Sequence, residues 1–508
     1  MSSPEPGPAS LNATRREREL AWLRDIGRID VLVVGAGVTG AGVALDAAAR
    51  GLTVALVDRH DLAFGTSRWS SKLVHGGLRY LASGEVSIAY ESAVERDILL
   101  RRTAPHLVRP FPQLVPLLPG VPRTVIRAGY LGGDLLRRAA GTSGALLPHS
   151  RRISPAETRR YAPTLRVDRL RGGILGWDGQ LYDDARLVVC LARTAASLGA
   201  AVLTRCAAEQ VTGDGAVLRD GLTGERFDVA ARVVVNATGV WAGRVASGIA
   251  LRPSRGSHLV LSQEQFGGLS AGLTIPVPGE RNRFVFVLPA PNRRVYLGLT
   301  DEDAPGEVPD VPEVTDTEID FLLAVVNRAL RVPVSHHDIL GSFAGLRPLL
   351  DNGDGARTAD LSRRHAVITS LDGLVTVIGG KLTTYRKMAQ HALDTALERR
   401  GVAAGPCVTH RLALVGAAGH TRVAASPRLI SKYGGEAPMV LAEARGDTTL
   451  LVPIADGIET TEAELRFAVR HEGALDVADL LDRRTRIGLV PTDRSRAVPT
   501  AERVLAEV

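Results

Sequence analysis

The chain has 508 residues, 45% of them hydrophobic, and 62 Lys plus Arg against 55 Asp plus Glu give it a formal net charge of +7. This length predicts two or three domains with sizeable cores, and the ordinary composition excludes collagen-like repeats, disulfide scaffolds and wholesale disorder. Aromatic residues make up only 4% and no run of five basic residues occurs, so we expect no nucleic-acid partner. The three cysteines form no CxxC pair, which predicts free thiols in a reducing compartment.

The first 28 residues are rich in Pro and Ser and then in charge, a pattern that predicts a flexible N-terminal lead-in. The longest mainly apolar stretch, residues 31–45, is too short for a transmembrane helix and contains a glycine-rich turn. We therefore expect a soluble or peripheral protein.

A β-branched run at residues 29–34 leads directly into the sequence GAGVTG at 35–40 and then into an Ala-rich helical pattern. A second predicted strand, residues 53–57, ends at Asp58. The glycines of such a GxGxxG segment allow a tight turn, close approach of a pyrophosphate and close packing of helix on strand. Because Asp58 is placed to hydrogen-bond a ribose hydroxyl, this unit predicts a dinucleotide-binding fold.

Further elements follow in a less regular order. A third predicted strand, residues 232–235, runs into Asn-Ala-Thr-Gly at 236–239. Short apolar runs alternate with turns from 258 to 345, which is typical of an antiparallel sheet. Another strand-turn-helix pattern covers 374–386, and a Gly- and Ala-rich linker after about residue 400 precedes a mostly helical tail.

Two long motifs decide between FAD and NAD. The segment GTSRWSSKLVHGGLRYL at 65–81 and the segment GGKLTTYR at 379–386 resemble the signatures of the FAD-dependent, quinone-linked glycerol-3-phosphate dehydrogenases. Shorter segments are similar to that family in the same order, and the resemblance spans roughly residues 29–490. These segments are residues 182–186, 236–239, 256–258, 345–348 and 471–486.

The resemblance implies an α/β fold with a Rossmann-like FAD-binding domain, an antiparallel-sheet substrate layer like that of glutathione reductase or D-amino-acid oxidase, and a C-terminal helical domain. The oxidoreductase domain is expected at 29–400 and the C-terminal domain at 401–508. Within the former, the FAD-binding parts are expected at about 29–100, 180–257 and 340–395, and the substrate layer at about 258–340.

Noncovalent FAD is the expected cofactor, since no His or Cys attachment motif is recognisable. Hydroxyl groups of the first long motif can hydrogen-bond the flavin and its phosphates. Lys72 and Lys381 stand out because nearly all basic residues of this chain are Arg. The use of Lys suggests that a compact ammonium is needed at these two positions. The expected FAD contacts are Gly35, Gly37, Gly40, Asp58, Thr66, Ser67, Ser70, Ser71, Lys72, Leu73, Ala237, Thr238, Gly239, Gly380, Lys381, Leu382 and Thr383.

A phosphorylated substrate carries close to two negative charges and needs a cluster of cations, preferably with the bidentate fork of Arg. The resemblance places Arg79, Arg347, Arg363 and Lys381 around glycerol phosphate, with Arg347 and Lys381 also in the catalytic set. The adjacent Arg364 leaves the register at Arg363 open.

His75 has the unperturbed pKa that suits a base removing the substrate hydroxyl proton. His258 and Tyr80, which the resemblance also places at the substrate, are the reserve candidates. No metal site is expected, because His471-Glu472 lacks the second His of HExxH and His336-His337 would point to opposite faces of a strand.

The implied reaction is oxidation of sn-glycerol 3-phosphate to dihydroxyacetone phosphate, with hydride transfer from C2 to flavin N5 and electrons passed to a membrane quinone. Two alternatives stay open: an oxidase that reduces oxygen to hydrogen peroxide, and an amine- or amino-acid-oxidase-like flavoenzyme whose cations would bind a carboxylate. We expect a cytoplasmic protein that binds an anionic membrane surface from the inner face. A homodimer is a further open expectation.

Residues 121–140 mix apolar side chains with four arginines and are the expected membrane contact. The chain also departs from the family at two places. Leu299 replaces a hydroxyl residue within Gly298-Leu299-Thr300-Asp301, and the bulky pair Arg68-Trp69 replaces smaller residues beside the flavin loop.

Overall fold

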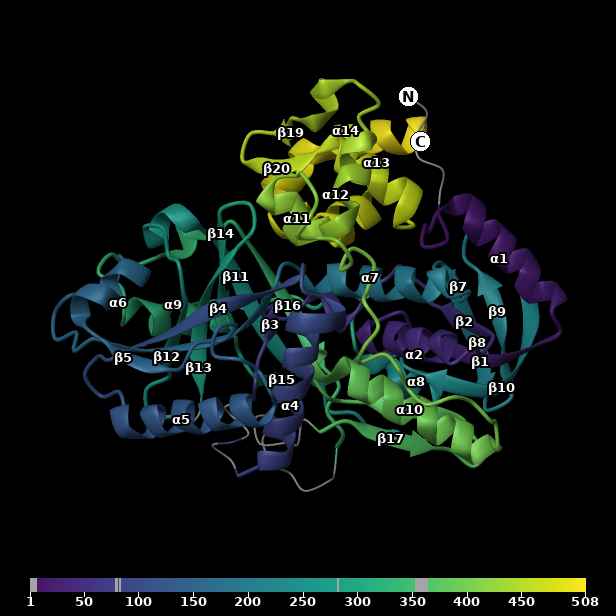
Figure 1. Cartoon of the computed structure of the whole chain (residues 1–508), viewed down its shortest axis with the longest axis horizontal. Coiled ribbons are helices and arrows are strands. Elements are labelled where there is room, and N and C mark those ends of the chain that lie inside the picture. The colour runs from purple at the N-terminus through teal and green to yellow at the C-terminus, as the bar shows by residue number, and fades with distance from the viewer. Residues whose placement is uncertain (1–6, 78–80, 82–83, 281–282, 352–363) are drawn as a thin grey trace.

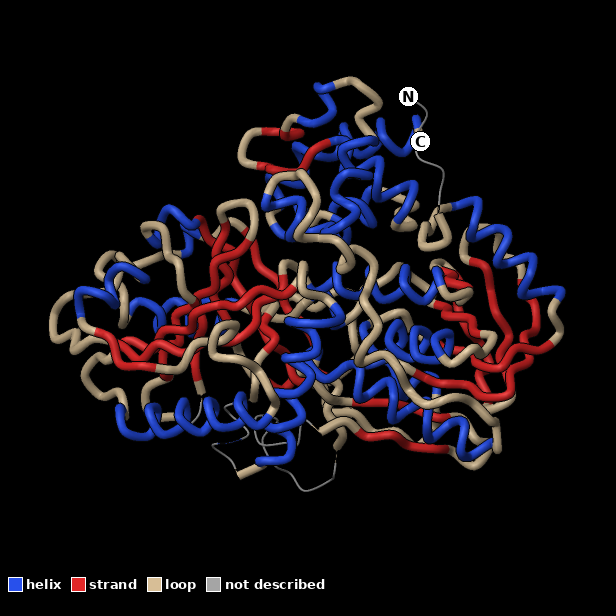
Figure 2. The backbone as a smooth tube through the Cα atoms, in the orientation of Figure 1, coloured by secondary structure: helices blue, strands red, loops and turns tan. Residues whose placement is uncertain are grey.

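The computed structural model describes residues 7–77, 81, 84–280, 283–351 and 364–508. Two strand-rich regions lie side by side, and a mostly helical domain lies above the place where they meet (Figure 1, Figure 2). Each strand-rich region is built on its own sheet.

The first sheet is the predicted dinucleotide-binding unit. Its strand order is β17-β18-β10-β1-β2-β7, and the five strands from β18 to β7 are mutually parallel. A hairpin of β8 and β9 extends β10. The strands are β1 (Arg28–Val34), β2 (Val54–Val57), β7 (Ala201–Leu203), β8 (Cys206–Thr212), β9 (Gly215–Asp220), β10 (Arg226–Asn236), β17 (Ala366–Thr369) and β18 (Val375–Ile378).

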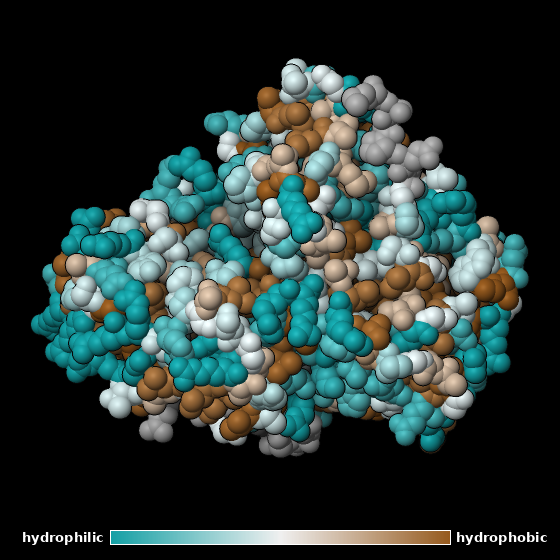
Figure 3. Space-filling view, viewed as in Figure 1, coloured by the Kyte–Doolittle hydropathy of each residue, from teal (hydrophilic) through white to brown (hydrophobic). Residues whose placement is uncertain are grey.

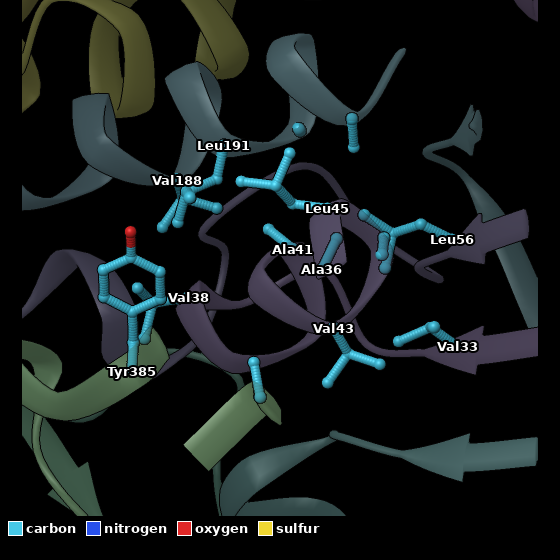
Figure 4. Packing of buried hydrophobic residues seen from close by; sticks show 14 of the residues in the cluster. Val33, Ala36, Val38, Ala41, Val43, Leu45, Leu56, Val188, Leu191 and Tyr385 are labelled. Atoms are coloured by element: carbon cyan, nitrogen blue, oxygen red, sulfur yellow. The ribbon is translucent and has the colours of Figure 1, made fainter. Parts of the chain in front are cut away.

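Helices α2 (Val38–Ala49), α7 (Asp184–Ser197) and α10 (Tyr385–Arg400) pack with this sheet around the largest buried core. Figure 4 shows side chains from strands and helices meeting there, among them Leu45, Val188 and Tyr385. A fully buried Leu or Val side chain contributes roughly 1.5–3 kcal/mol. The continuous apolar runs of the sequence are therefore explained by burial on both faces of a parallel sheet.

The second sheet is the predicted substrate layer, but it recruits more of the chain than residues 258–340. Its strand order is β15-β11-β14-β13-β12-β4-β6-β3, with β16 paired to β11 and β5 paired to β6. The pairing is antiparallel except between β12 and β4. The strands are β3 (Leu73–Val74), β4 (Val108–Pro116), β5 (Arg151–Ile153), β6 (Gly173–Leu181), β11 (Ser254–Ser262), β12 (Gly272–Pro276), β13 (Phe284–Ala290), β14 (Arg294–Gly298), β15 (Glu302–Asp303) and β16 (Gly341–Arg347).

The expected boundaries therefore need correction. Strands β3 and β16 lie within the predicted FAD-binding parts but belong to the second sheet, because they pair with β6 and β11. The remaining helices of the oxidoreductase region are α4 (Val86–Ile98), α5 (Arg123–Ala139), α6 (Pro155–Tyr161), α8 (Ala242–Val245) and α9 (Asp316–Asn327).

The flexible lead-in expected over residues 1–28 is also corrected for the described part of that segment. Helix α1 (Ala13–Asp25) begins at Asn12, whose side chain accepts the Arg15 N–H. Leu20 and Leu23 are buried against the first sheet, and the buried Arg16 forms an ion pair of 2.6 Å with Asp220. The charged pattern thus belongs to an ordered surface helix with one buried face.

The C-terminal domain is mostly helical, as predicted, with a small hairpin of β19 (Pro453–Ala455) and β20 (Ile458–Thr461). Its helices are α11 (Pro427–Tyr433), α12 (Ala437–Ala442), α13 (Glu462–His471) and α14 (Pro491–Glu507). Arg483 and Arg484 both bond the fully buried Asp61 of the first domain, at 2.6 and 2.7 Å. Arg186 of α7 binds the buried Glu472 with both terminal guanidinium nitrogens.

None of the helices in the described residues is both long enough and apolar enough to cross a bilayer.

The buried Glu464 of α13 allows a test of what stabilises the interior of the C-terminal domain. It accepts bonds from Arg428 and Lys432 at 2.7 and 2.9 Å. Burial alone would raise its pKa, but Lys432 and Arg428 outweigh that effect and lower the pKa to about 2. The ionised carboxylate is thus stabilised in the folded state at neutral pH, by roughly 3 kcal/mol.

We expect Glu464→Gln to lower the free energy of unfolding by about 3 kcal/mol at pH 7, measured by urea denaturation. A depressed pKa gives stability that is lost as the pH falls through the folded-state value, so the difference between the two proteins should shrink from about pH 4.5 towards 2. A difference independent of pH would contradict this account.

Candidate active site

The glycine-rich turn between β1 and α2 has no room for side chains. Gly35 has φ of +103°, and a Cβ there would lie 2.7 Å from the Ala237 carbonyl oxygen. A Cβ on Gly40 would lie 1.8 Å from the Gly35 oxygen. The turn therefore lets the end of β10 approach β1 closely. It also places the first turn of α2 at the carboxyl ends of the parallel strands. This arrangement fits the pyrophosphate of a dinucleotide.

Asp58 lies where β2 ends, as predicted for a ribose-binding acid. Its carboxylate accepts the backbone N–H groups of Ala36 and His60 at 2.7 and 2.8 Å. Burial raises its pKa to about 6, although these two donors act in the opposite direction. Asp58 therefore braces the glycine turn in addition to any contact with a ribose.

The hydroxyl groups of Thr66, Ser67, Ser70 and Ser71 all have partners within the protein. Ser67 accepts the N–H of Val38 at the start of α2, and a Cβ on Gly37 would lie 3.0 Å from the Ser67 oxygen. Thr66 donates to the Leu346 carbonyl at 2.6 Å. These contacts tie the segment after β2 to both sheets, while its role at the flavin stays a prediction.

Lys72 is only 2% exposed and forms an ion pair of 3.1 Å with Asp184. Its ammonium also bonds the backbone oxygens of Arg68 and Ser70 and lies 4.6 Å from the centre of the Phe343 ring. Burial lowers the pKa of Lys72, and Asp184 opposes this only in part. A cation enclosed in this way holds the shape of the loop it belongs to.

Asp184 fixes that loop from the other side as well. Its carboxylate accepts both the backbone N–H and the hydroxyl of Ser70 at 2.8 Å. The sequence placed residues 182–186 in a family motif but did not identify this role of Asp184. The unusual choice of Lys at position 72 was the available signal that a buried carboxylate partner would be present.

Arg347 ends β16 and projects over Gly256, where a Cβ would lie 2.3 Å from the guanidinium. Its Nη1 donates to the Ser254 hydroxyl at 3.1 Å and to Asp301 at 3.2 Å, and its Nη2 donates to the Thr300 carbonyl at 3.2 Å. These contacts fix the plane of the fork. Because Asp301 offsets part of the charge, Arg347 needs further cations to bind a dianion.

Lys381 follows two glycines with positive φ, Gly379 and Gly380, and precedes the short helix η7 (Leu382–Thr384) that leads into α10. Its ammonium donates to the Ser92 hydroxyl of α4 at 2.9 Å. No local pattern marked Ser92, which lies 289 residues away in the sequence. Lys381 therefore joins α4 to the start of α10.

The two candidate histidines differ in environment. His75 is half-buried, and its Nδ1 accepts the Gly77 N–H at 3.2 Å, which puts the proton of the neutral ring on Nε2. His258 is buried, stacks on Phe343 at 4.7 Å and shares a 2.8 Å hydrogen bond with Ser71. Burial, together with Lys72 and Arg347, lowers the pKa of His258 well below its ordinary value.

The structure thus joins many of the predicted site residues. The segment 66–72 contacts β11 and β16 of the second sheet, close to Arg347 and His258, while Ala237 meets the glycine turn. Arg79, Tyr80 and Arg363 lie outside the described residues.

The two departures from the family pattern also have structural contacts. Leu299 follows β14, and the neighbouring Thr300 donates to Glu318 at 2.7 Å, so a polar contact remains at this bend. Trp69 packs directly against Gly345, because a Cβ added to Gly345 would lie only 2.7 Å from the Cβ of Trp69.

Comparisons with known proteins agree with this geometry. Residues 30–386 match the family described as FAD dependent oxidoreductase, and residues 407–508 match the C-terminal domain of alpha-glycerophosphate oxidase. Glycerol-3-phosphate dehydrogenase 1 of Mycobacterium tuberculosis is 55% identical over 513 residues, covering 99% of both chains. The chain belongs to the family of FAD-dependent glycerol-3-phosphate dehydrogenases.

More distant relatives support the same assignment. A mitochondrial glycerol-3-phosphate dehydrogenase of Arabidopsis thaliana is 34% identical, covering 94% of this chain and 82% of its own. The glycerol-3-phosphate dehydrogenase of Bacillus halodurans, solved in complex with FAD, superposes with a TM-score of 0.75 at 26% identity, covering 98% of this chain and 93% of that one. FAD is the cofactor, and the fold class predicted from the sequence is confirmed.

We expect the flavin to be held without a covalent bond, so acid or heat should release all of it into the supernatant. Gly37→Val should remove most bound FAD, because the side chain would enter the space beside Ser67 that the pyrophosphate needs. Flavin absorbance per chain measures both. Gly405→Val is the control, since Gly405 has nothing within 4 Å of its Cβ position. Yellow colour retained in the precipitate would contradict noncovalent attachment.

Proposed function

We propose that the protein oxidises sn-glycerol 3-phosphate to dihydroxyacetone phosphate and passes the electrons to a membrane quinone. The observation that carries the proposal is the oriented Arg347 fork, set at the edge of the substrate sheet next to the segment 66–72. The names of the relatives that match over nearly the full chain support glycerol 3-phosphate over an amine or amino acid as the substrate.

The guanidinium group of Arg347 is held in a fixed orientation, which suits the binding of a phosphate. Both of its terminal nitrogens are already held by Ser254, Asp301 and Thr300, so little side-chain freedom remains to be lost when a phosphate binds. Because the Asp301 carboxylate is only 3.2 Å away, the dianion also needs the charge of Lys381. Together with the predicted Arg79 and Arg363, these residues orient the C2 carbon of the substrate.

Bound FAD supplies a two-electron acceptor for the hydride on C2. The protein must then take the hydroxyl proton, and the half-buried His75 is the proposed acceptor, because imidazole is the side chain best suited to accept a proton near neutral pH. The Gly77 N–H occupies Nδ1, so that contact has to open before Nδ1 can accept a proton. His258 stays neutral in its buried position and is the second candidate.

The proposed contact with the membrane is helix α5, within the predicted segment 121–140. Leu131 and Leu135, four residues apart, are 47% and 65% exposed and lie on one stripe of the helix, while Val125, 67% exposed, lies roughly 100° around the helix axis from them. Figure 3 shows hydrophobic atoms along the lower left edge of the molecule, where α5 runs in Figure 1. An exposed apolar stripe of this kind suits the interface of a bilayer.

Of the four arginines expected to contact the membrane, two bind within the protein instead. Arg137 is buried and donates to the Thr142 carbonyl at 2.6 Å, and Arg127 donates to the Ser150 carbonyl at 2.9 Å. Both therefore hold α5 on the protein. Arg123 and Arg138 are exposed and can face anionic headgroups, and Arg138 also contacts His149 Nε2 at 3.3 Å.

The electron acceptor decides between a dehydrogenase and an oxidase. We expect the FAD-loaded enzyme to turn over glycerol 3-phosphate with a soluble quinone analogue much faster than with oxygen alone. In that assay Arg347→Ala should raise KM about tenfold or more, because a charge-assisted hydrogen bond contributes roughly 1.5–3 kcal/mol. Arg399→Gln, an exposed cation on α10, is the control. Faster turnover with oxygen, producing hydrogen peroxide, would establish the oxidase instead.

His75→Ala should lower the rate of flavin reduction by glycerol 3-phosphate, with a smaller effect on KM. Anaerobic stopped-flow absorbance measures this rate without any electron acceptor. General-base catalysis typically contributes about 100-fold or more. An unchanged rate would remove His75 as the base, and His258→Ala is the next variant to measure.

Anionic vesicles should bind the protein at low salt, measured by co-sedimentation. Replacing Val125, Leu131 and Leu135 by Ser should release it, since each buried CH₂ contributes about 0.8 kcal/mol to membrane binding. Leu222→Ser is the control, because Leu222 is 59% exposed in the turn between β9 and β10 of the first sheet. A wild-type protein that stays in the supernatant at low salt would refute the peripheral assignment.

A further inference from the structure

A cavity of about 440 Å³ lies between α4 and α10 and is lined in part by Lys381 of the candidate active site. Three cations and two imidazoles line it: Arg364, Lys381, Lys387, His365 and His391. Among the candidate substrate cations that the structure describes, only Lys381 reaches it. Arg347 is held separately by Ser254, Asp301 and Thr300 on the second sheet.

The positive charge of this cavity is only partly offset by acids. Asp394 also lines it but forms an ion pair of 2.6 Å with Arg50. Burial and the neighbouring Glu95 raise the pKa of Glu91, the other acid in the wall. Lys387 has no carboxylate partner within 4 Å among the residues that the structure describes. Lys387 therefore forms no direct ion pair within the described part of the chain, although Glu91 lies close enough for Lys387 to lower the pKa of its carboxyl group.

The two imidazoles add hydrogen-bonding groups. His365 Nε2 and His391 Nδ1 are 3.1 Å apart, so one of them donates to the other. Burial, with the charges of His391, Lys387 and Arg364, lowers the pKa of His365 to about 4. An imidazole in such surroundings becomes easier to protonate when an anion arrives, because the anion opposes the neighbouring positive charges.

The choice of lysine is a second, independent observation. Lys occurs only at positions 72, 381, 387 and 432, and every other cation is Arg. Lys72 and Lys432 are buried against Asp184 and Glu464. The remaining two lysines line the same cavity. A compact ammonium with three donors suits a tetrahedral anion, which it can contact as a point charge.

We propose that this cavity is a second anion site, separate from the Arg347 site, which binds a phosphate monoester through Lys387 and His391. The monoester could come from a dissolved metabolite or from the headgroup of a lipid. The second source has a structural basis, because α4 forms one wall of the cavity and packs against α5, the helix with the exposed apolar stripe.

Chemical labelling of lysine tests the site without measuring turnover. The FAD-loaded enzyme is acetylated with an N-hydroxysuccinimide ester, and the rate at Lys387 is followed by peptide mass spectrometry. Inorganic phosphate should slow acetylation of Lys387 in a saturable way relative to chloride at the same ionic strength. The same protection is expected in Arg347→Ala, which separates this site from the proposed substrate site.

His391→Leu should weaken the phosphate protection about tenfold, as expected for loss of one charge-assisted contact. Arg399→Gln, on the same helix but outside the cavity, should leave it unchanged. Flavin content shows whether each variant is folded. Equal acetylation of Lys387 in phosphate and chloride, with no protection by the vesicles described next, would overturn the proposal.

Vesicles distinguish the two sources of the monoester. Protection by dissolved phosphate identifies a soluble ligand, whereas protection by phosphatidylcholine vesicles containing phosphatidate, but not by dissolved phosphate, identifies a lipid headgroup. Vesicles of phosphatidylglycerol, whose phosphate is a diester, are the control. If they protect Lys387 equally and dissolved phosphate does not, the effect is general shielding by the membrane and the proposal fails.

Discussion

The close contact between the glycine turn and the end of β10 is the constraint on which the site depends. Gly35 and Gly40 leave no space for a Cβ because the Ala237 carbonyl and the turn itself occupy it. This contact sets the distance between two parallel strands at their carboxyl ends and so defines the crevice in which a dinucleotide binds. Asp58 then fixes the turn through the Ala36 N–H.

A single segment carries that geometry into the second sheet. Thr66 bonds the backbone beside Arg347, Ser71 bonds His258, and β3 pairs with β6 only a few residues later. The buried pair of Lys72 and Asp184 keeps this segment in shape. Residues that would contact the cofactor and residues that would contact the substrate are consequently held by one continuous piece of chain.

The sequence alone predicted those strands and helices whose residue patterns depend on neighbours in the chain. The strand, glycine turn, helix and terminal acid at 29–58 predicted β1, α2 and β2 correctly, because each residue acts within its own turn or strand. The second sheet was underestimated, since β4 contains Pro110, Pro112 and Pro116, and prolines weaken any strand prediction. The partners of Lys72 and Lys381 could not be derived either, because Asp184 and Ser92 approach them only through tertiary packing.

The ion pair between Asp61 and the two arginines Arg483 and Arg484 gives the C-terminal domain a role beyond covering the molecule. Asp61 lies three residues after Asp58, in the segment that leaves β2. Removing the tail would leave Asp61 and Arg186 without their partners, and an unpaired buried charge is strongly destabilising. The first domain therefore depends on the tail for the ion pairs of Asp61 and Arg186. Truncation would therefore act on the segment next to Asp58 and the glycine turn, far from the point of truncation in sequence.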